Sequence, residues 1–232
     1  MTLLTVCQAV ARDAGFDVPA SIVANTDDTA VQLLALATKA GEILARKPWQ
    51  NLQNEYTFTT VIGQAEYDLP PGYRAFIDDT AWDRTNYWQL RGSLSPQEWQ
   101  ARKSGVISQS PRSRFRVKGN KIVIDPTPTA ELDFVIEYLD SRWVNKQGGE
   151  DRETTFTNDT DTVRFDEFLL QLELLWRFLG RKGLAYLEEK QESDVQIAIA
   201  MARDTPSVPM NLAGSSEPWP PLPTVPVTGF GP

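Results

Sequence analysis

The proline-rich segment at residues 204–232 most restricts what this chain can fold into. It holds eight of the sixteen prolines and three of the fourteen glycines, with two charged side chains. Proline lacks a backbone N–H and fixes φ, so neither a helix nor a central strand can continue through such a segment. We therefore expect a folded region that ends near residue 203, followed by an extended arm.

The arm differs from a flexible linker because apolar side chains recur along it. A stiff, extended chain with such anchors typically lies along another surface. This pattern favours a component of an assembly over an enzyme, with the arm as its docking element on a neighbouring chain. The candidate docking residues are Pro209, Met210, Leu212, Trp219, Leu222, Val225 and Phe230.

The composition argues against several functional classes. A formal net charge of −8 disfavours binding of nucleic acid by the protein as a whole, although a local basic patch is compatible with it. The chain has no histidine, which excludes a Ser-His-Asp triad, a Cys-His pair and nearly every zinc site. Cys7 lies in an apolar helical stretch, which predicts a buried side chain rather than a reactive thiol. We expect no metal, no cofactor and no catalytic residue.

Other features suggest a site, but each has a simpler interpretation. The carboxylate-rich segment 150–161 lacks the spacing and glycine of an EF-hand, which favours a solvated loop ending in a helix N-cap. Trp82, Trp88 and Trp99 would suit a sugar-stacking platform, yet tryptophans are more often core or interface residues. No stretch approaches twenty apolar residues and the N-terminus lacks a basic leader region, so we expect neither a membrane span nor a signal peptide.

The period of the apolar residues changes twice along the folded region. Apolar positions recur at helical spacing over residues 1–48, alternate over about 53–144, and return to helical spacing over about 163–203. Helices from the two ends of the chain can bury their apolar stripes by packing together. We therefore predict an α+β fold: a bundle of N- and C-terminal helices with an inserted antiparallel β lobe. The predicted domains are 1–203 and the arm, 204–232.

Local signals define several boundaries. The second helix must end before Pro48, because the residue before a proline avoids helical geometry. Ser95 and Glu98 frame a helix start, and Gly119-Asn120 predicts a hairpin turn. Gly63-Gln64 predicts another hairpin, between the alternating segments on either side of it.

Two further expectations concern the C-terminal half of the folded region. Residues 145–161 are predicted to form a polar loop. The final helix is expected to continue to the arm on an apolar stripe. This stripe comprises Leu184, Leu187, Val195, Ala198, Ile199 and Ala202.

A row of basic residues forms the candidate charged interface. Arg112, Arg114, Arg116 and Lys118 alternate along one predicted strand, opposite Phe115. Their charges therefore share one face, which would suit an acidic neighbour or a nucleic-acid backbone. The pattern favours a solvated strand face with carboxylates on the neighbouring strand, and both functional alternatives stay open.

Several motifs resemble those of a known family when they are taken in order. They are Lys47-Pro48-Trp49 at a helix end, Tyr67-Asp68-Leu69-Pro70 in a strand, residues 118–126 around a hairpin, the strand at 136–139, and Asp166-Glu167-Phe168 opening a Leu-rich helix. This order, over residues 1–203, resembles the head-to-tail adaptor proteins of short-tailed phages, of the tail tubular protein A type.

The resemblance implies a structural virion protein without enzymatic activity. It implies a ring, by family habit a homododecamer, that joins the portal protein to the tail nozzle protein. DNA would pass through its lumen without specific binding, and the C-terminal arm would dock on the portal. The protein would reside at the head-tail junction of the virion, and in the host cytoplasm during assembly. The alternative is a carbohydrate-binding or hydrolytic tail component, supported by the aromatic residues and carboxylates alone.

Overall fold

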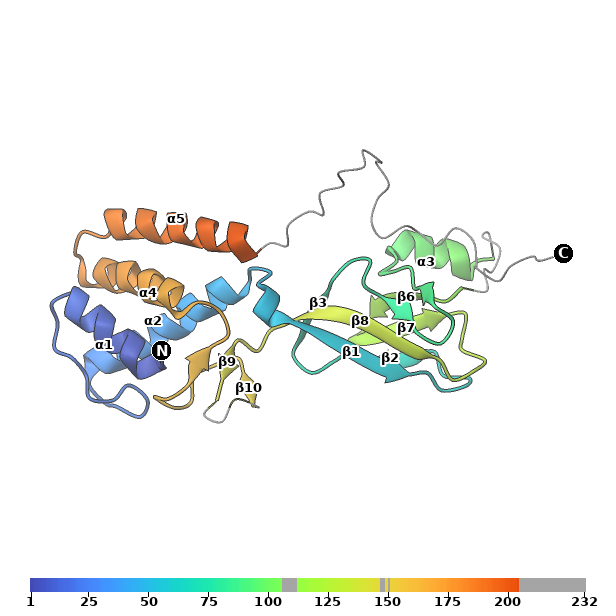
Figure 1. Ribbon diagram of the computed structural model, residues 1–232, viewed down its shortest axis with the longest axis horizontal. Coiled ribbons are helices and arrows are strands. Elements are labelled where there is room, and N and C mark those ends of the chain that lie inside the picture. Colours follow the sequence, from blue (N-terminus) through green and yellow to red (C-terminus); the bar gives the residue numbers. More distant parts are fainter. Residues whose placement is uncertain (106–111, 147–148, 150, 205–232) are drawn as a thin grey trace, which may run out of the picture.

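A computed structural model describes residues 1–105, 112–146, 149 and 151–204. The molecule is elongated and has a helical body at one end and a β lobe at the other (Figure 1). Each end has its own hydrophobic core, one made mainly by the helices and one made by the strands. This arrangement confirms the mixed α+β class, while the predicted arm at 205–232 lies outside the described residues.

The first two helices lie within the predicted helical region 1–48, and the second ends before Pro48 as predicted. Helix α1 spans Leu3–Asp13 and α2 spans Asp28–Ala45. The side chain of Asp27 caps α2, because its carboxylate accepts hydrogen bonds from the first free backbone N–H groups. The chain leaves α2 before Pro48, and the indole of Trp49 donates to the carbonyl of Leu44 at 2.8 Å. The buried tryptophan therefore closes the end of this helix.

Two C-terminal helices complete the helical body. Helix α4 spans Glu167–Lys182 and contacts α1, α2 and the last helix, α5, which spans Leu187–Asp204. Buried leucines on α4 and Phe178 fill the shared core. Helix α4 ends at Gly183, whose φ of 74° is the left-handed conformation that glycine adopts without steric cost.

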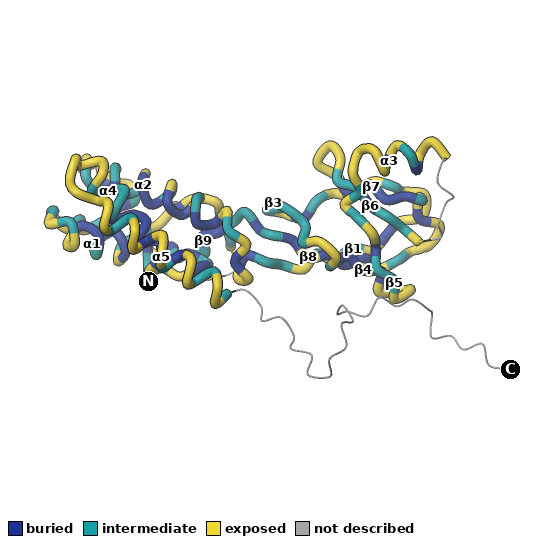
Figure 2. The backbone as a smooth tube through the Cα atoms, turned by 90° about the horizontal axis from the view of Figure 1, so that it is seen from above, coloured by how far each residue is buried: buried dark blue, intermediate teal, exposed yellow. Residues whose placement is uncertain are grey.

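The apolar stripe predicted for α5 does not face the core. Leu187 and Val195 are 66% and 54% exposed, and the remaining stripe residues, Leu184, Ala198, Ile199 and Ala202, are exposed as well. Helix α5 instead packs through Ser193 and Ile197, and Figure 2 shows how much of its surface is accessible. The predicted helix is confirmed, but the stripe is not the buried face. This helix carries apolar residues on more than one face, and packing against α4 determines which of them are buried.

The β lobe is a sandwich of two antiparallel sheets. In the first, β1 (Gln53–Thr59) pairs with β8 (Asp133–Asp140) over its whole length, and β8 also pairs with β3 (Tyr73–Phe76) and β4 (Trp82–Asp83). Strand β5 (Trp88–Gln89) pairs with β4 at the edge. The second sheet has the order β2 (Glu66–Asp68), β7 (Lys121–Asp125) and β6 (Arg114–Lys118).

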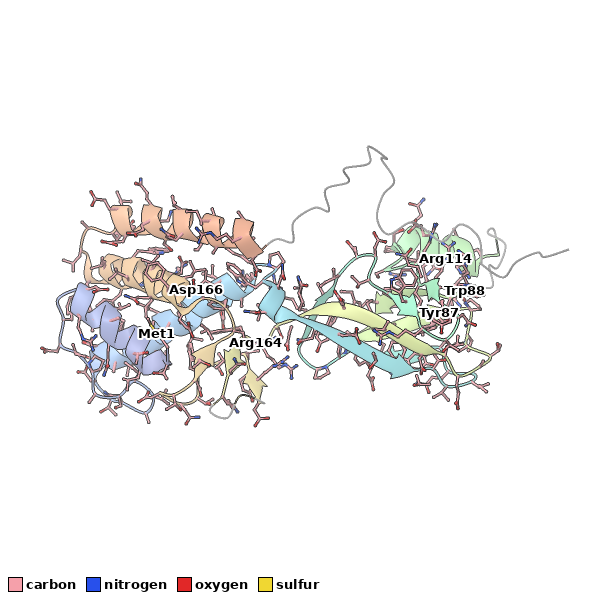
Figure 3. The ribbon with its side chains drawn as sticks, in the orientation of Figure 1. Met1, Tyr87, Trp88, Arg114, Arg164 and Asp166 are labelled. Atoms are coloured by element: carbon pink, nitrogen blue, oxygen red, sulfur yellow. The ribbon has the colours of Figure 1, made fainter. Side chains whose placement is uncertain are left out.

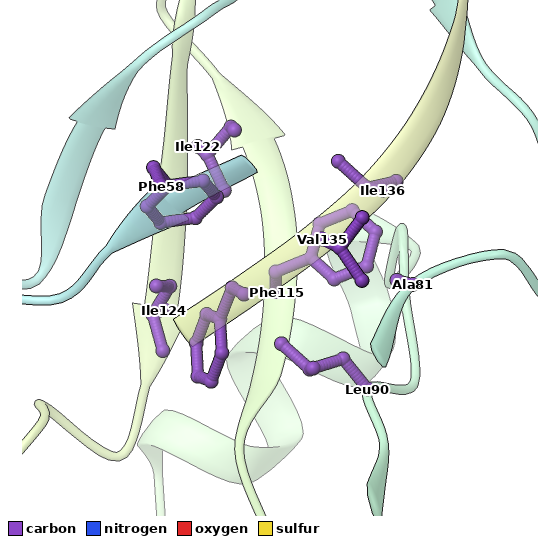
Figure 4. Close-up of a pocket in the computed structure, with 9 residues that line it drawn as sticks. Phe58, Ala81, Leu90, Phe115, Ile122, Ile124, Val135 and Ile136 are labelled. Atoms are coloured by element: carbon purple, nitrogen blue, oxygen red, sulfur yellow. The ribbon is translucent and has the colours of Figure 1, made fainter. Parts of the chain in front are cut away.

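The inner faces of the two sheets pack together. Aromatic and branched side chains such as Phe58, Phe115 and Ile124 meet there (Figure 4). The apolar gap between the sheets measures about 10 Å³, no more than a single water would need. This space is therefore a packed core and offers no ligand site.

The sequence-based predictions for the β lobe are partly confirmed. Strands β6 and β7 form the hairpin predicted at Gly119-Asn120, and helix α3 (Pro96–Lys103) begins with the capping box of Ser95 and Glu98. The hairpin predicted around Gly63-Gln64 is wrong, because β1 pairs with β8 and β2 pairs with β7. Alternation predicts that a segment is a strand, but it does not say which strand will satisfy its hydrogen bonds.

The predicted polar loop at 145–161 contains additional structure. Strands β9 (Val144–Asn145), β10 (Arg152–Glu153) and β11 (Thr162–Val163) form a small antiparallel sheet beside the helices. Each strand has two residues, which is too short for alternation to be detected in the sequence. A short 3-10 turn, η1 (Gln50–Leu52), links α2 to β1.

One buried carboxylate holds the two ends of the molecule together. Asp140, at the end of β8, is fully buried. It accepts hydrogen bonds from Arg142 at 2.9 Å, from Arg164 at 3.2 Å and from Asn54 at 3.0 Å, and Arg152 lies 3.6 Å away. Figure 3 shows Arg164 at this junction. These contacts fix the β lobe relative to the helical body, because their donors come from both.

Candidate functional site

The predicted basic residues lie on the outer face of the smaller sheet. Arg114, Arg116 and Lys118 alternate on β6 with the buried Phe115, so their side chains point away from the sandwich core. Lys118 and Lys121 lie directly opposite each other on the two strands at the tip of the β6–β7 hairpin. In the described part of the chain, Arg116 and Lys118 form no ion pair.

The carboxylate expected on the neighbouring strand is present but already engaged. Asp125 lies opposite Arg114 on β7, yet its side chain binds Arg102 and Lys103 of helix α3, the latter at 2.5 Å. Burial would raise the pKa of Asp125, but the hydrogen bonds from Lys103 and Arg102 outweigh burial and hold its pKa below the usual value. Asp125 therefore anchors α3 and forms no ion pair with Arg116 or Lys118 of β6.

The neighbourhood of Arg114 is crowded with positive charge. Burial lowers the pKa of its guanidinium, and the nearby cations of Arg102 and Arg91 lower it further. Arg112 precedes the strand and lies over the ring of Trp88, 5.7 Å from the ring centroid. Figure 3 shows Arg114 and Trp88 in the same part of the lobe. We call Lys103, Arg114, Arg116, Lys118 and Lys121 the basic face.

The outer face of the larger sheet carries carboxylates that the sequence analysis did not single out. Glu55 on β1 and Glu137 on β8 lie directly opposite each other, and like charges in such a pair repel. A groove of about 470 Å³ runs beside them and is also lined by Asp79, Trp82 and Tyr87. We call these five residues the acidic face. The sequence analysis missed this face because it depends on the pairing of β1 with β8, which brings together residues 82 positions apart in the chain.

The acidic face is only partly neutralised from within the chain. Glu55 forms an ion pair with Arg84 at 2.9 Å. Asp79 and Glu137 form no ion pair with any described residue. Tyr87 is 81% exposed, so the groove has an accessible aromatic wall.

The three tryptophans considered for a sugar platform do not share a surface. Trp99 lies on helix α3 and is buried. Trp82 and Trp88 lie on neighbouring strands, but Trp82 pairs with Gln89 and Asp83 pairs with Trp88. Because side chains alternate along a strand, Trp82 and Trp88 point to opposite sides of the sheet. The structure therefore gives no support to a stacking platform made by these residues.

Two carboxylates of the segment 150–161, Asp159 and Asp161, stabilise loops. Asp159 accepts backbone hydrogen bonds from Ile22 and Val23, the shortest at 2.7 Å, and Asp161 accepts them from Thr157 and Asn158. The expected helix N-cap is instead Asp166, five residues further on. Among the described residues, no group of three or more histidine, cysteine, aspartate or glutamate side chains could hold a metal ion.

Cys7 is buried, as predicted. Burial, with a smaller contribution from the charge of Asp159, raises the pKa of its thiol to about 12. At neutral pH this thiol is protonated and has the packing role of a small apolar side chain.

The proposed docking residues of the arm, from Pro209 to Phe230, lie outside the described residues. The end of α5 is described, and Asp204 there accepts a hydrogen bond from the backbone of Gln50 at 2.7 Å. Asp204, which the sequence analysis assigned to the arm, therefore belongs to helix α5 and to the folded region. None of the helices in the described ranges is long and apolar enough to cross a membrane.

Residues 1–205 match the family model described as SU10 adaptor protein. The chain belongs to this family, which makes it a phage structural adaptor protein. No curated protein matches the chain at a significant level.

Proposed function

We propose that this protein is a head-to-tail adaptor that forms a ring of twelve copies between the portal and the tail nozzle, with DNA passing through the lumen during ejection. The observation that carries the proposal is the family match over residues 1–205. The elongated shape supports it, because a connector needs two separate rigid surfaces for two partners (Figure 1). The links at Asp140 support it too, since they make the two ends one rigid unit.

The test is reconstitution with the portal protein of the same phage. We expect the mixture to give a complex with one ring of this protein on one face of the portal, seen by electron microscopy and counted by native mass spectrometry. At physiological salt the free protein should be monomeric or weakly associated, because its net charge of −8 makes subunits repel. Failure of the protein to bind the portal would contradict the adaptor function. A stable ring of the free protein would contradict only the need for the portal as a template, and a different subunit count would contradict only the twelvefold ring.

We also propose that the arm, residues 205–232, docks on the portal. Its prolines restrict the free chain, so ordering it costs less conformational entropy than ordering a Gly/Ser segment. Trp219 lies between two prolines and is the strongest candidate anchor. Burial of such a ring is worth about 2–3 kcal/mol, so Trp219→Ala should weaken portal binding by roughly tenfold or more.

The matched experiment removes the whole arm after Asp204. This truncation retains the contact of Asp204 with Gln50, so we expect the unfolding temperature to stay unchanged while portal binding falls sharply. Unfolding of the truncated chain would mean that the arm packs on its own domain. Normal portal binding would mean that the arm is not the docking element.

The last part of the proposal concerns the lumen. DNA must slide through it, and each lysine or arginine that contacts phosphate adds salt-dependent affinity. We therefore expect a largely acidic or neutral lumen, with the basic face turned elsewhere. A ring in which Arg112, Arg114 and Arg116 line the channel would contradict this expectation and make these residues a brake on DNA.

A further inference from the structure

The β lobe has two outer faces of opposite charge. Figure 2 shows α3, β6 and β7 along one side of the lobe and β4 and β5 along the other. The basic face lies on the first side and the acidic face on the second. We propose that these faces bind each other between copies, so that the basic face of one molecule docks on the acidic face of the next. This inference rests on the proposed function, for which it identifies the contact between neighbouring subunits.

The basic face is only partly neutralised within the chain. Lys103 binds Asp125, and Lys121 lies opposite Asp68 of β2. Arg116 and Lys118 have no ion-pair partner in the described residues, and Lys121 has only a 3.8 Å contact with Glu66. The lysines stand side by side at the β6–β7 tip, although like charges in such a pair repel. An acidic surface on a partner would relieve this repulsion.

The acidic face offers a matching receptor. Its groove of about 470 Å³ is also lined by Arg84, which pairs with Glu55, while Asp79 and Glu137 have no ion pair among the described residues. The aromatic side chains of Trp82 and Tyr87 line the same groove, and such rings bind the stems and charged heads of lysine and arginine. The groove therefore fits a basic hairpin tip in both charge and chemistry.

The geometry favours a head-to-tail contact between copies. The faces lie on opposite sides of one sandwich, so a single molecule cannot bring them together. A twofold dimer would place each face against itself and oppose like charges. Repetition of one basic-to-acidic contact instead gives a heterologous assembly, which closes into a ring when the rotation allows. A nucleic-acid backbone would also suit the basic face, but it would leave the acidic face without a partner.

The experiment uses two variants of the full chain with reversed charges. In the first, Arg116→Glu and Lys118→Glu make the basic face acidic. In the second, Glu55→Lys and Glu137→Lys make the acidic face basic. Self-association is measured by sedimentation at about 0.01 M salt, where the Debye length is about 30 Å, and again at about 1 M salt, where it is about 3 Å.

We expect the wild type to associate at low salt and to dissociate at high salt. Each variant alone should associate at least about tenfold more weakly, because like charges then face each other. An equimolar mixture of the variants should recover association, since every contact in an alternating assembly again joins opposite charges. Two control variants each reverse two charges on the helical body. The first carries Lys39→Glu and Arg203→Glu, and the second carries Glu188→Lys and Glu192→Lys. These controls should associate like the wild type.

Four results would overturn the pairing of faces. They are a wild type that stays monomeric at low salt, a mixture that does not recover, controls that weaken as much as the variants, and a basic face that binds duplex DNA in place of a second copy. Portal binding by the same variants separates this inference from the adaptor function. If either variant forms normal rings on the portal, the proposed contact between the basic and acidic faces is wrong, but the adaptor function is not contradicted. If the wild type self-associates but does not bind the portal, the adaptor function is wrong, but the contact between faces is not contradicted.

Discussion

Gly41 provides a sharp test of how the helical body is packed. It lies within α2, where a Cβ atom would come 2.1 Å from the ring carbon Cη2 of Trp143 and 2.2 Å from Cζ3. The indole is buried, and it stacks on Phe165 at 6.0 Å and meets Phe156 edge-on at 5.0 Å between ring centroids. The ring therefore cannot move away from an added methyl group without disturbing both neighbours.

Two opposing effects determine the outcome of Gly41→Ala. Replacing glycine by alanine within a helix favours folding by about 1 kcal/mol. Forcing an extra carbon into a packed core typically costs about 1–3 kcal/mol, and an overlap this close belongs at or above the upper end. We expect a net loss of about 2 kcal/mol in the free energy of unfolding, measured by urea denaturation followed through helical circular dichroism.

Gly180→Ala is the matched control. Gly180 is also helical, in α4, but the nearest atom to its added Cβ would be a ring carbon of Tyr186 at 3.5 Å, an ordinary contact distance. The same substitution should therefore stabilise the protein by about 0.5–1 kcal/mol. A Gly41→Ala variant as stable as the wild type, or as stable as the control, would refute the close packing of Trp143 against α2.

Three further predictions concern single side chains. Asp140→Asn should lower the free energy of unfolding by about 3–5 kcal/mol in the same assay, because it leaves the junction arginines uncompensated; the exposed Asp133→Asn should change it by less than about 0.5 kcal/mol. Cys7 should resist a thiol-reactive dye in the native state and react on unfolding, since a rise of its pKa from 9.0 to about 12 lowers the thiolate population about a thousandfold. The pKa of Asp125 is lower in the folded protein, so its ionised side chain should stabilise the fold above the usual aspartate pKa of about 3.9. This contribution should be lost as the pH falls through the lower folded-state pKa. In pH-dependent denaturation, an Asp125→Asn variant with the same acid dependence as the wild type would contradict this.

Much of this protein follows from the sequence alone, because the relevant forces act over short distances. Helix boundaries were predicted from capping residues and from Pro48, and the α3 capping box and the Gly119-Asn120 hairpin needed only a few adjacent residues. The burial of Cys7 followed from its apolar helical surroundings. The β6 face was predicted from alternation, since side chains on a strand point to opposite sides in turn.

The tertiary structure decided what depends on partners distant in the chain. Only the pairing of β1 with β8 brings Glu55 beside Glu137 and creates the acidic face. Only the packing of α4 on α5 selected Ile197 rather than Val195 as the buried residue. Asp140 collects donors from segments spread over more than a hundred residues, so no local pattern marks it. Local propensity specifies the elements, whereas long-range packing and charge select which of their faces meet.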